Sequence, residues 1–184
     1  GTTLGTVLGA VRRIRRRTEM PLLLFSYYNP LLRHGLERLA GEAREAGIDG
    51  ALVTDLPPEE AQGWLEVARP AGLDTVFLAA PTSPDERLRL VAEACRGFVY
   101  AVSRTGVTGE RRSLSDDARP LVERLRARTE VPVALGFGIS TPEQVAQAAA
   151  VADGVVVGSA LVRFLEEHPE GDLGERVRWL KSAT

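Results

Sequence analysis

The chain has 184 residues, of which 44% are hydrophobic and 26% are charged, a balance typical of one globular domain with a substantial core. Its formal net charge is −2, which excludes a strong global attraction to nucleic acid or to an anionic membrane. No apolar run is long enough to span a membrane, and the single cysteine, Cys95, excludes an intrachain disulfide. We therefore expect one domain over residues 1–184, in the cytoplasm, with no nucleic-acid or membrane partner.

Helix-like and strand-like segments alternate along the chain. The first helix is predicted over 3–17, and its five arginines indicate a solvated face because no aromatic residues interleave them. Strands are then predicted at 22–27, 51–54, 75–79, 98–103, 133–137 and 155–157. Helices are predicted at 31–46, 58–71, 84–94, 116–129, 142–150, 160–167 and 173–182. Most of these strands are apolar on both faces, as in a parallel sheet covered by helices. About six βα units predict an α/β fold, either a barrel or a doubly wound sheet.

Two glycine turns follow the last two predicted strands. They are Gly136-Phe137-Gly138-Ile139-Ser140 and Gly158-Ser159-Ala160, and each leads into a predicted helix. A strand that ends in glycine and enters a helix leaves backbone N–H groups without partners, and the helix dipole there favours negative charge. Two such turns in tandem indicate one phosphate site, as strands 7 and 8 of a (βα)8 barrel build it. Tight turns that only join strands to packing helices are the alternative.

A long loop and a few side chains complete the candidate site. Residues 104–112 follow the strand at 98–103, and their two glycines suit a lid over a ligand. Asp55, at the end of a strand, could act as an acid or base, although capping or loop support is the better interpretation. Four side chains could form an apolar pocket for an aromatic ligand: Tyr27, Leu78, Tyr100 and Phe137. The sequence contains no obvious carboxylate pair, Ser/His/Asp set or metal cluster.

Four motifs, in the same order along the chain, resemble those of the tryptophan synthase alpha chain family. The most specific is YAVSRTGVTG at 100–109, which is similar to the family's YxxSxxGxTG loop. The stretch GFGISTPEQV at 136–145 resembles the family's GFGIS-PEQV, and Asp55-Leu56-Pro57 and Gly158-Ser159-Ala160-Leu161-Val162 also fit. The resemblance extends from about residue 2 to residue 167.

This resemblance implies a (βα)8 TIM barrel, of which this chain would supply about six βα units, and a lyase of tryptophan biosynthesis. The family cleaves indole-3-glycerol phosphate to indole and glyceraldehyde 3-phosphate by a retro-aldol step. By position, the phosphate would be held by Gly109, Gly138, Gly158 and Ser159. The indole pocket would be lined by Tyr27, Leu52, Thr54, Leu78, Tyr100 and Phe137, and Thr108 would belong to the mobile loop.

The resemblance also implies a partner. The family's α chain uses no cofactor or metal and passes indole to a β chain that carries pyridoxal phosphate, in an α2β2 heterotetramer. The family's catalytic glutamate ends the second barrel strand, and its catalytic aspartate lies on the following loop. Residues 1–17 resemble the helix after that loop, so we expect that the first two strands are absent and that the chain alone is inactive. Asp55 matches a different family position and does not replace either carboxylate.

Two other functions stay open from the residues themselves. One is another phosphate-binding TIM barrel, such as a sugar-phosphate isomerase or epimerase, which would need a carboxylate, histidine or metal at the strand ends. The other is a non-catalytic fragment that binds a partner chain.

Overall fold

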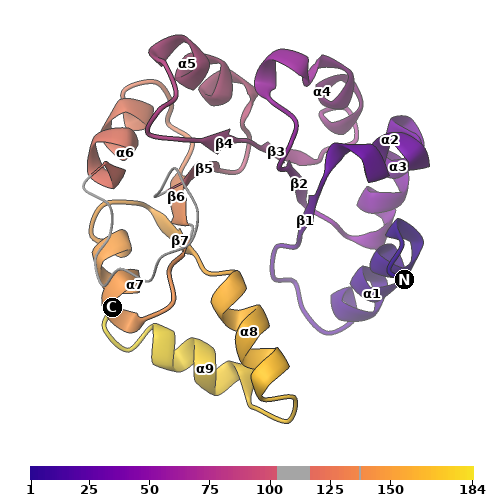
Figure 1. The fold of residues 1–184 in the computed structure, drawn as a ribbon. Coiled ribbons are helices and arrows are strands. Elements are labelled where there is room, and N and C mark those ends of the chain that lie inside the picture. The colour runs from indigo at the N-terminus through magenta and orange to yellow at the C-terminus, as the bar shows by residue number, and fades with distance from the viewer. Residues whose placement is uncertain (103–116, 137) are drawn as a thin grey trace. The chain divides into compact units, whose positions relative to one another are not determined.

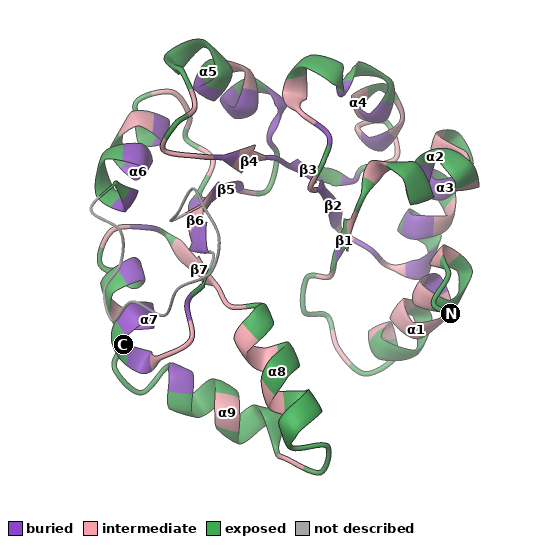
Figure 2. Ribbon diagram, viewed as in Figure 1, coloured by how far each residue is buried: buried purple, intermediate pink, exposed green. Residues whose placement is uncertain are grey.

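The computed structural model describes residues 1–102, 117–136 and 138–184. They form two compact units: residues 1–78 with 93–98, and residues 79–92 with the described part of 99–184. In both units parallel strands alternate with helices along the chain (Figure 1). Burial follows this alternation: β2 is buried along its whole length, whereas the helices expose one face (Figure 2). None of the helices within these ranges is long and apolar enough to cross a membrane.

The first unit is built on a three-stranded parallel sheet. Its strands, in the order β1-β2-β3, are β1 (Leu23–Ser26), β2 (Gly50–Val53) and β3 (Asp74–Val76). Its helices are α1 (Leu4–Arg15), α2 (Tyr28–His34), α3 (Leu36–Ala46), the 3-10 turn η1 (Pro58–Glu60) and α4 (Gln62–Ala68). Trp64 on α4 is 1% exposed and is among the largest side chains of the core.

The second sheet has four strands in the order β4-β5-β6-β7. They are β4 (Leu78–Ala79), β5 (Val99–Val102), β6 (Val133–Gly136) and β7 (Gly154–Val156). The accompanying helices are α5 (Asp85–Ala94), α6 (Ala118–Arg126), α7 (Pro142–Ala149), α8 (Ser159–Glu167) and α9 (Leu173–Leu180). The pairs β5–β6 and β6–β7 are parallel, as their apolar sequences predict.

The predicted helix at 31–46 is wrong as a single element. The structure begins α2 at Tyr28 and ends it at His34, and the next residue, Gly35, has a φ of +90° that residues with a side chain rarely adopt. The Gly35 amide donates to the carbonyls of Leu31 and Leu32, which closes α2, and α3 then starts at Leu36. Hydrophobic spacing runs through this break, so periodicity alone does not reveal it. The predicted helix at 58–71 is likewise divided into η1 and α4.

The predicted strand at 75–79 is also divided. β3 ends at Val76 and β4 begins at Leu78, and the two belong to different sheets. Phe77 lies between them with 2% of its surface exposed, and its backbone N–H donates to the sulfur of Cys95 at 3.3 Å. A buried amide must have a partner, and here a side chain supplies the partner in place of a neighbouring strand.

Cys95 is expected to be inert in the folded chain. It is 4% exposed, and burial raises the pKa of its thiol to about 12. The thiolate is the reactive form, so we expect alkylation by iodoacetamide at pH 8 to be at least about 100-fold slower in buffer than in urea. Mass spectrometry of timed samples measures both rates. Equal rates in the two conditions would show that the thiol is accessible in the native fold.

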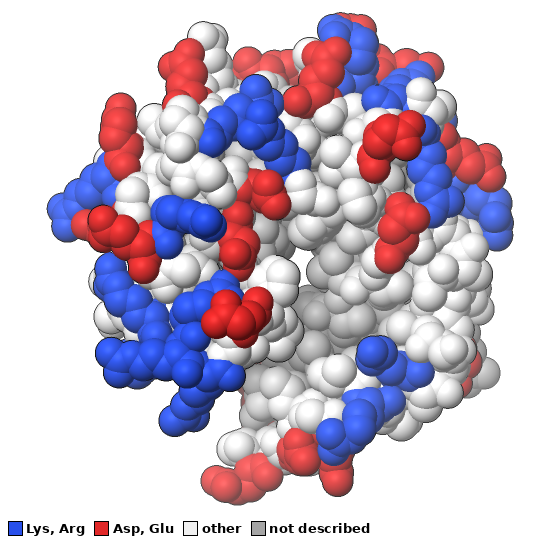
Figure 3. Space-filling view, turned by 180° about the vertical axis from the view of Figure 1, so that it is seen from behind, with Lys and Arg blue, Asp and Glu red and all other residues white. Residues whose placement is uncertain are grey.

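The arginine-rich first helix is α1, and Thr3 caps it by accepting from the Thr6 amide. Of the five arginines at 12–17, four are exposed: Arg12, Arg13, Arg16 and Arg17. In the rear view of Figure 3 a group of basic side chains covers this end of the chain, at the lower left. Arg15 differs from them, because its side chain is 20% exposed and bonds to neighbouring backbone. The solvated face is therefore formed by the other four.

Candidate functional site

In the first unit, three of the predicted pocket residues lie on one face of the sheet. Leu52 on β2 pairs with Phe25 on β1, and paired residues of parallel strands point to the same side. Tyr27 continues β1 in extended conformation, and Thr54 donates its backbone N–H to the carbonyl of Ser26 at 3.0 Å. Two residues further along each strand, Tyr27 and Thr54 return to the face of Phe25 and Leu52.

Phe25 is a candidate that sequence reasoning missed. It is 62% exposed, although it is a large aromatic residue within a strand. Tyr27 beside it is 66% exposed, whereas Leu52 is 1% exposed and forms the floor of this face. An exposed aromatic pair over a buried leucine offers apolar surface to a planar ligand. The signal in the sequence is the alternation that places Phe25 two residues before Tyr27.

Asp55 supports the end of β1 and carries no sign of acid or base chemistry. Its Oδ1 accepts the backbone N–H of Tyr28, the first residue of α2, at 2.7 Å. The carboxylate thereby satisfies one of the amides that a helix leaves open at its start. The interpretation of Asp55 as a supporting residue agrees with this bond, and the bond also fixes the backbone next to Tyr27.

In the second unit, Tyr100 lies across the end of β6. Its ring and hydroxyl come so close to Gly136 that a β-carbon there would be 2.5 Å from Cε2 and 2.6 Å from the hydroxyl oxygen. The same β-carbon would be 2.8 Å from Cβ of Val156 on β7. Tyr100 is 8% exposed, and its burial raises the pKa of the hydroxyl. The tyrosine therefore stays neutral and extends from β5 toward the strand end that carries the first glycine turn.

The first glycine turn is only partly open. Gly138 is exposed, has φ +78°, and its amide has no acceptor among the described residues. The amides of Ser140 and Thr141 are already used, because both donate to Oε1 of Gln144 at 2.8 and 3.3 Å. Gln144 and Thr141 form a capping box at the start of α7. Not every amide of this turn is therefore free to bind a phosphate. Among the described residues named here, the Gly138 amide is the one that agrees with the expectation.

The second glycine turn is open. Gly158 and Ser159 are exposed at the start of α8, and no side chain caps this helix. Within the described ranges their two amides meet no hydrogen-bond acceptor. Open amides at the N-terminus of a nine-residue helix favour an anion.

The remaining predicted site residues divide into two groups. Leu78, at the start of β4, is half-buried. Thr108, Gly109, Phe137 and the proposed lid at 104–112 lie outside the described residues.

No group of three or more His, Cys, Asp or Glu side chains in the part of the chain that the structure describes could hold a metal ion. His34 is satisfied by Glu42 at 2.8 Å, and His168 stacks on Phe164.

These elements define an α/β protein of parallel strands and covering helices, whose candidate binding residues lie on the strands or just after their C-terminal ends. Over residues 1–182 the chain matches the family described as Tryptophan synthase alpha chain. The chain belongs to this family, a family of lyases, and its α/β fold of parallel strands is that of part of the family's (βα)8 TIM barrel.

Relatives support this assignment at substantial identity. The chain is 56% identical over 170 residues to the tryptophan synthase alpha chain of Solibacter usitatus, covering 92% of this chain and 64% of the relative. It is 52% identical over 183 residues to that of Geobacter sulfurreducens, covering 100% of this chain and 69% of the relative. The chain thus spans about two thirds of the length of these relatives.

Solved structures agree with the sequence relatives. A structure of the tryptophan synthase a2b2 complex from Pyrococcus furiosus matches with a TM-score of 0.89 and 39% identity, covering 100% of this chain and 74% of that one. A protein from Aquifex aeolicus matches with a TM-score of 0.90 and 40% identity, covering 100% and 70%.

Proposed function

We propose that this chain is part of a tryptophan synthase α subunit, a carbon–carbon lyase that cleaves indole-3-glycerol phosphate to indole and glyceraldehyde 3-phosphate in tryptophan biosynthesis. The observation that carries the proposal is the pair of exposed glycine turns after β6 and β7. The amides of Gly138, Gly158 and Ser159 are open within the described residues, and open amides at a helix start bind phosphate without a basic side chain. Gly109 joins them in this proposal through its family position.

The indole is proposed to bind to apolar and aromatic side chains. In the first unit these are Tyr27, Leu52 and Thr54, which share one sheet face, together with Leu78. In the second unit Tyr100 offers a neutral hydroxyl on a buried ring. Phe137 and Thr108 complete the set by family position. An apolar face with few polar groups matches a ligand that is a flat aromatic ring with a single N–H.

The reaction needs acid–base groups beyond those of the described residues. In the retro-aldol step an acid protonates the indole ring at C3 and a base accepts the proton of the hydroxyl on the adjoining glycerol carbon. The bond from C3 to that carbon then breaks, its electrons return to the ring, and glyceraldehyde 3-phosphate leaves as the aldehyde. Asp55 is the one carboxylate in the described ranges that follows the C-terminal end of a strand by no more than two residues, and it is bonded to the Tyr28 amide. We therefore propose that these 184 residues alone bind the substrate but do not turn it over.

The proposed setting is a cytoplasmic α2β2 assembly. The α subunit would need no cofactor or metal, and pyridoxal phosphate would be carried by the β chain. Support comes from the similar Pyrococcus furiosus structure of a tryptophan synthase a2b2 complex. We also propose that residues 1–184 act as a single domain, in which the two compact units fold together.

Titration calorimetry with indole-3-propanol phosphate, inorganic phosphate and indole tests the proposal. Binding of the phosphorylated indole, with inorganic phosphate competing, is expected. If the protein binds a β chain but neither phosphate ligand, the partner-binding alternative replaces this proposal.

Phe25→Ala is expected to weaken indole binding about 5- to 10-fold, because it removes roughly 1–1.4 kcal/mol of aromatic contact. Its affinity for inorganic phosphate should stay unchanged, since the phosphate turns lie after β6 and β7. Leu32→Ala serves as a control, because Leu32 on α2 is 50% exposed and outside the predicted pocket. Fluorescence titration with indole measures the effect, and equal affinities for all three proteins would exclude Phe25 from the site.

A further inference from the structure

The same residue pattern occurs twice, once in each unit. Arg-x-Arg-Thr-Glu-x-Pro is found at 15–21 and again at 126–132, and a strand, β1 or β6, begins within two residues of the end of each copy. An Asp-Gly pair then opens the neighbouring strand: Asp49-Gly50 enters β2, and Asp153-Gly154 enters β7. The strands β1 and β2 are paired with each other, and so are β6 and β7.

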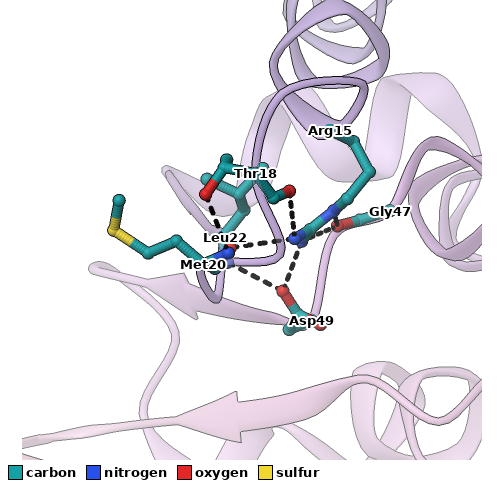
Figure 4. A network of polar contacts seen from close by, with 6 residues as sticks. All are labelled: Arg15, Thr18, Met20, Leu22, Gly47 and Asp49. Atoms are coloured by element: carbon teal, nitrogen blue, oxygen red, sulfur yellow. Dashed lines mark hydrogen bonds and ion pairs between the residues drawn. The ribbon is translucent and has the colours of Figure 1, made fainter.

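In the first unit the arginine and the aspartate close the start of the strand pair (Figure 4). Oδ2 of Asp49 accepts the backbone N–H of Leu22 at 2.7 Å, and the Asp49 amide donates back to the Leu22 carbonyl at 2.9 Å. Arg15 binds the same carboxylate oxygen at 2.7 Å. Its guanidinium also donates to three backbone carbonyls, those of Gly47, Thr18 and Met20.

In the second unit the equivalent residues make equivalent bonds. Oδ2 of Asp153 accepts the backbone N–H of Val133 at 2.8 Å, and the Asp153 amide donates to the Val133 carbonyl at 2.9 Å. Arg126 binds Oδ1 of the same carboxylate at 2.7 Å. The Val133 amide, and after it Arg126, lower the pKa of Asp153 from its ordinary value, so the group is charged at neutral pH.

The correspondence includes the turn before each strand. Oγ1 of Thr18 accepts the Met20 amide at 3.1 Å, and Oγ1 of Thr129 accepts the Val131 amide at 3.1 Å. The turn and the strand entry are therefore held in the same way in both units, and in both an arginine at the helix end pairs with the aspartate. We call the two sets, Arg15 with Asp49 and Arg126 with Asp153, the strand clamps.

We propose that the strand clamps are positioning devices, and that Asp153 with Arg126 sets the phosphate turns by fixing β7 against β6. This inference rests on the proposed function. Each clamp makes a ring of two hydrogen bonds at the first residue of a strand pair, where a one-residue slip would move every side chain to the other face. The pair β6–β7 leads, within two residues, to Gly138 and Gly158, whereas the pair β1–β2 leads directly to Tyr27 and Thr54. The two clamps therefore position different parts of the ligand.

The negative charge of Asp153 allows an effect on the position of the phosphate turns to be distinguished from a direct electrostatic effect on phosphate binding. Asp153 precedes Gly158 by a strand length of about 16 Å, beyond the roughly 8 Å over which exposed charges act at physiological salt. Removing this negative charge could only strengthen the binding of an anion. A loss of phosphate affinity on its removal therefore has to come from displaced turns.

Paired substitutions test the proposal, with inorganic phosphate and indole as separate probes in calorimetry. Asp153→Ala is expected to weaken phosphate binding about 10-fold, because small displacements of binding groups are costly, and to weaken indole binding by a smaller factor, since β6 also contacts Tyr100 of the proposed indole site. Asp153→Asn keeps an oxygen that can accept from Val133, so it should restore most of the lost affinity. Asp49→Ala is the matched control: it should lose a similar amount of thermal stability, weaken indole binding, and leave phosphate binding intact.

The outcomes separate the two proposals. If wild-type protein binds no phosphate, the proposed function fails and this inference fails with it. If wild type binds but Asp153→Ala binds equally well or more tightly, or if Asp49→Ala weakens phosphate binding as much, the inference alone is overturned. Should Asp153→Ala not fold, Arg126→Ala replaces it, because it removes the ion pair and leaves the bond to Val133. Its phosphate affinity is expected to fall about 3-fold, and an unchanged affinity would overturn the inference.

Discussion

Ser159→Asp is expected to abolish phosphate binding while leaving the fold at least as stable. The substitution places a carboxylate at the first residue of α8, where the proposed phosphate would lie. Two unit charges about 4 Å apart repel by roughly 4 kcal/mol near a protein surface, so the affinity should fall by more than about 100-fold. The same carboxylate interacts favourably with the helix N-terminus, by about 0.3–1 kcal/mol.

Ser159→Asp is informative because it should weaken phosphate binding without destabilising the fold. Ser159→Asn has nearly the same shape without the charge and should keep most of the phosphate affinity. Calorimetry with inorganic phosphate and urea denaturation of both variants give the two quantities. If Ser159→Asp binds phosphate as tightly as wild type does, the anion is not held at this turn.

Gly136→Ala is expected to destabilise the chain by about 1–3 kcal/mol, as overpacking of a core does. The new methyl group would lie within 2.8 Å of both the Tyr100 ring and Val156. The ring is rigid and buried, so either it or the strand β6 must move. Urea denaturation followed by circular dichroism measures the loss.

Two further variants isolate the cause. Gly154→Ala is the matched control on β7, because its nearest neighbour would be the β-carbon of Ala134 at an ordinary 3.5 Å. Combining Gly136→Ala with Tyr100→Ala removes the obstructing ring, so the double variant should be more stable than the two separate losses added together predict. Strict additivity of the two losses would place the strain elsewhere.

Most of the fold can be predicted from the sequence, because strand runs and helix periodicities are strong signals here. The strands at 22–27, 51–54, 98–103, 133–137 and 155–157 are all present to within two residues at either end. The capping box at Thr141 follows from its residue types as well. What the sequence does not show is the break at Gly35, because the apolar spacing continues across it, and the interruption at Phe77.

The candidate site is predictable in part. Gly138, Gly158 and Ser159 follow from strand ends that lead into helices, but the loss of the Ser140 amide to Gln144 depends on a side-chain rotamer. Phe25 requires knowledge of register, which places it beside Leu52. The strand clamps do have a signal in the sequence, namely the repeated Arg-x-Arg-Thr-Glu-x-Pro and the two Asp-Gly pairs. Only the hydrogen bonds reveal what those repeats hold together.

The sulfur of Cys95 has a consequence for where the first sheet stops. Phe77 lies between β3 and β4, and its amide is bonded to Cys95, 18 residues further along the chain. Alanine at position 95 would leave that N–H orphaned, at a cost of about 1–3 kcal/mol, and serine would keep an acceptor only if the backbone moved closer. The end of the first sheet is therefore supported by the sulfur of Cys95, a residue that belongs to neither β3 nor β4.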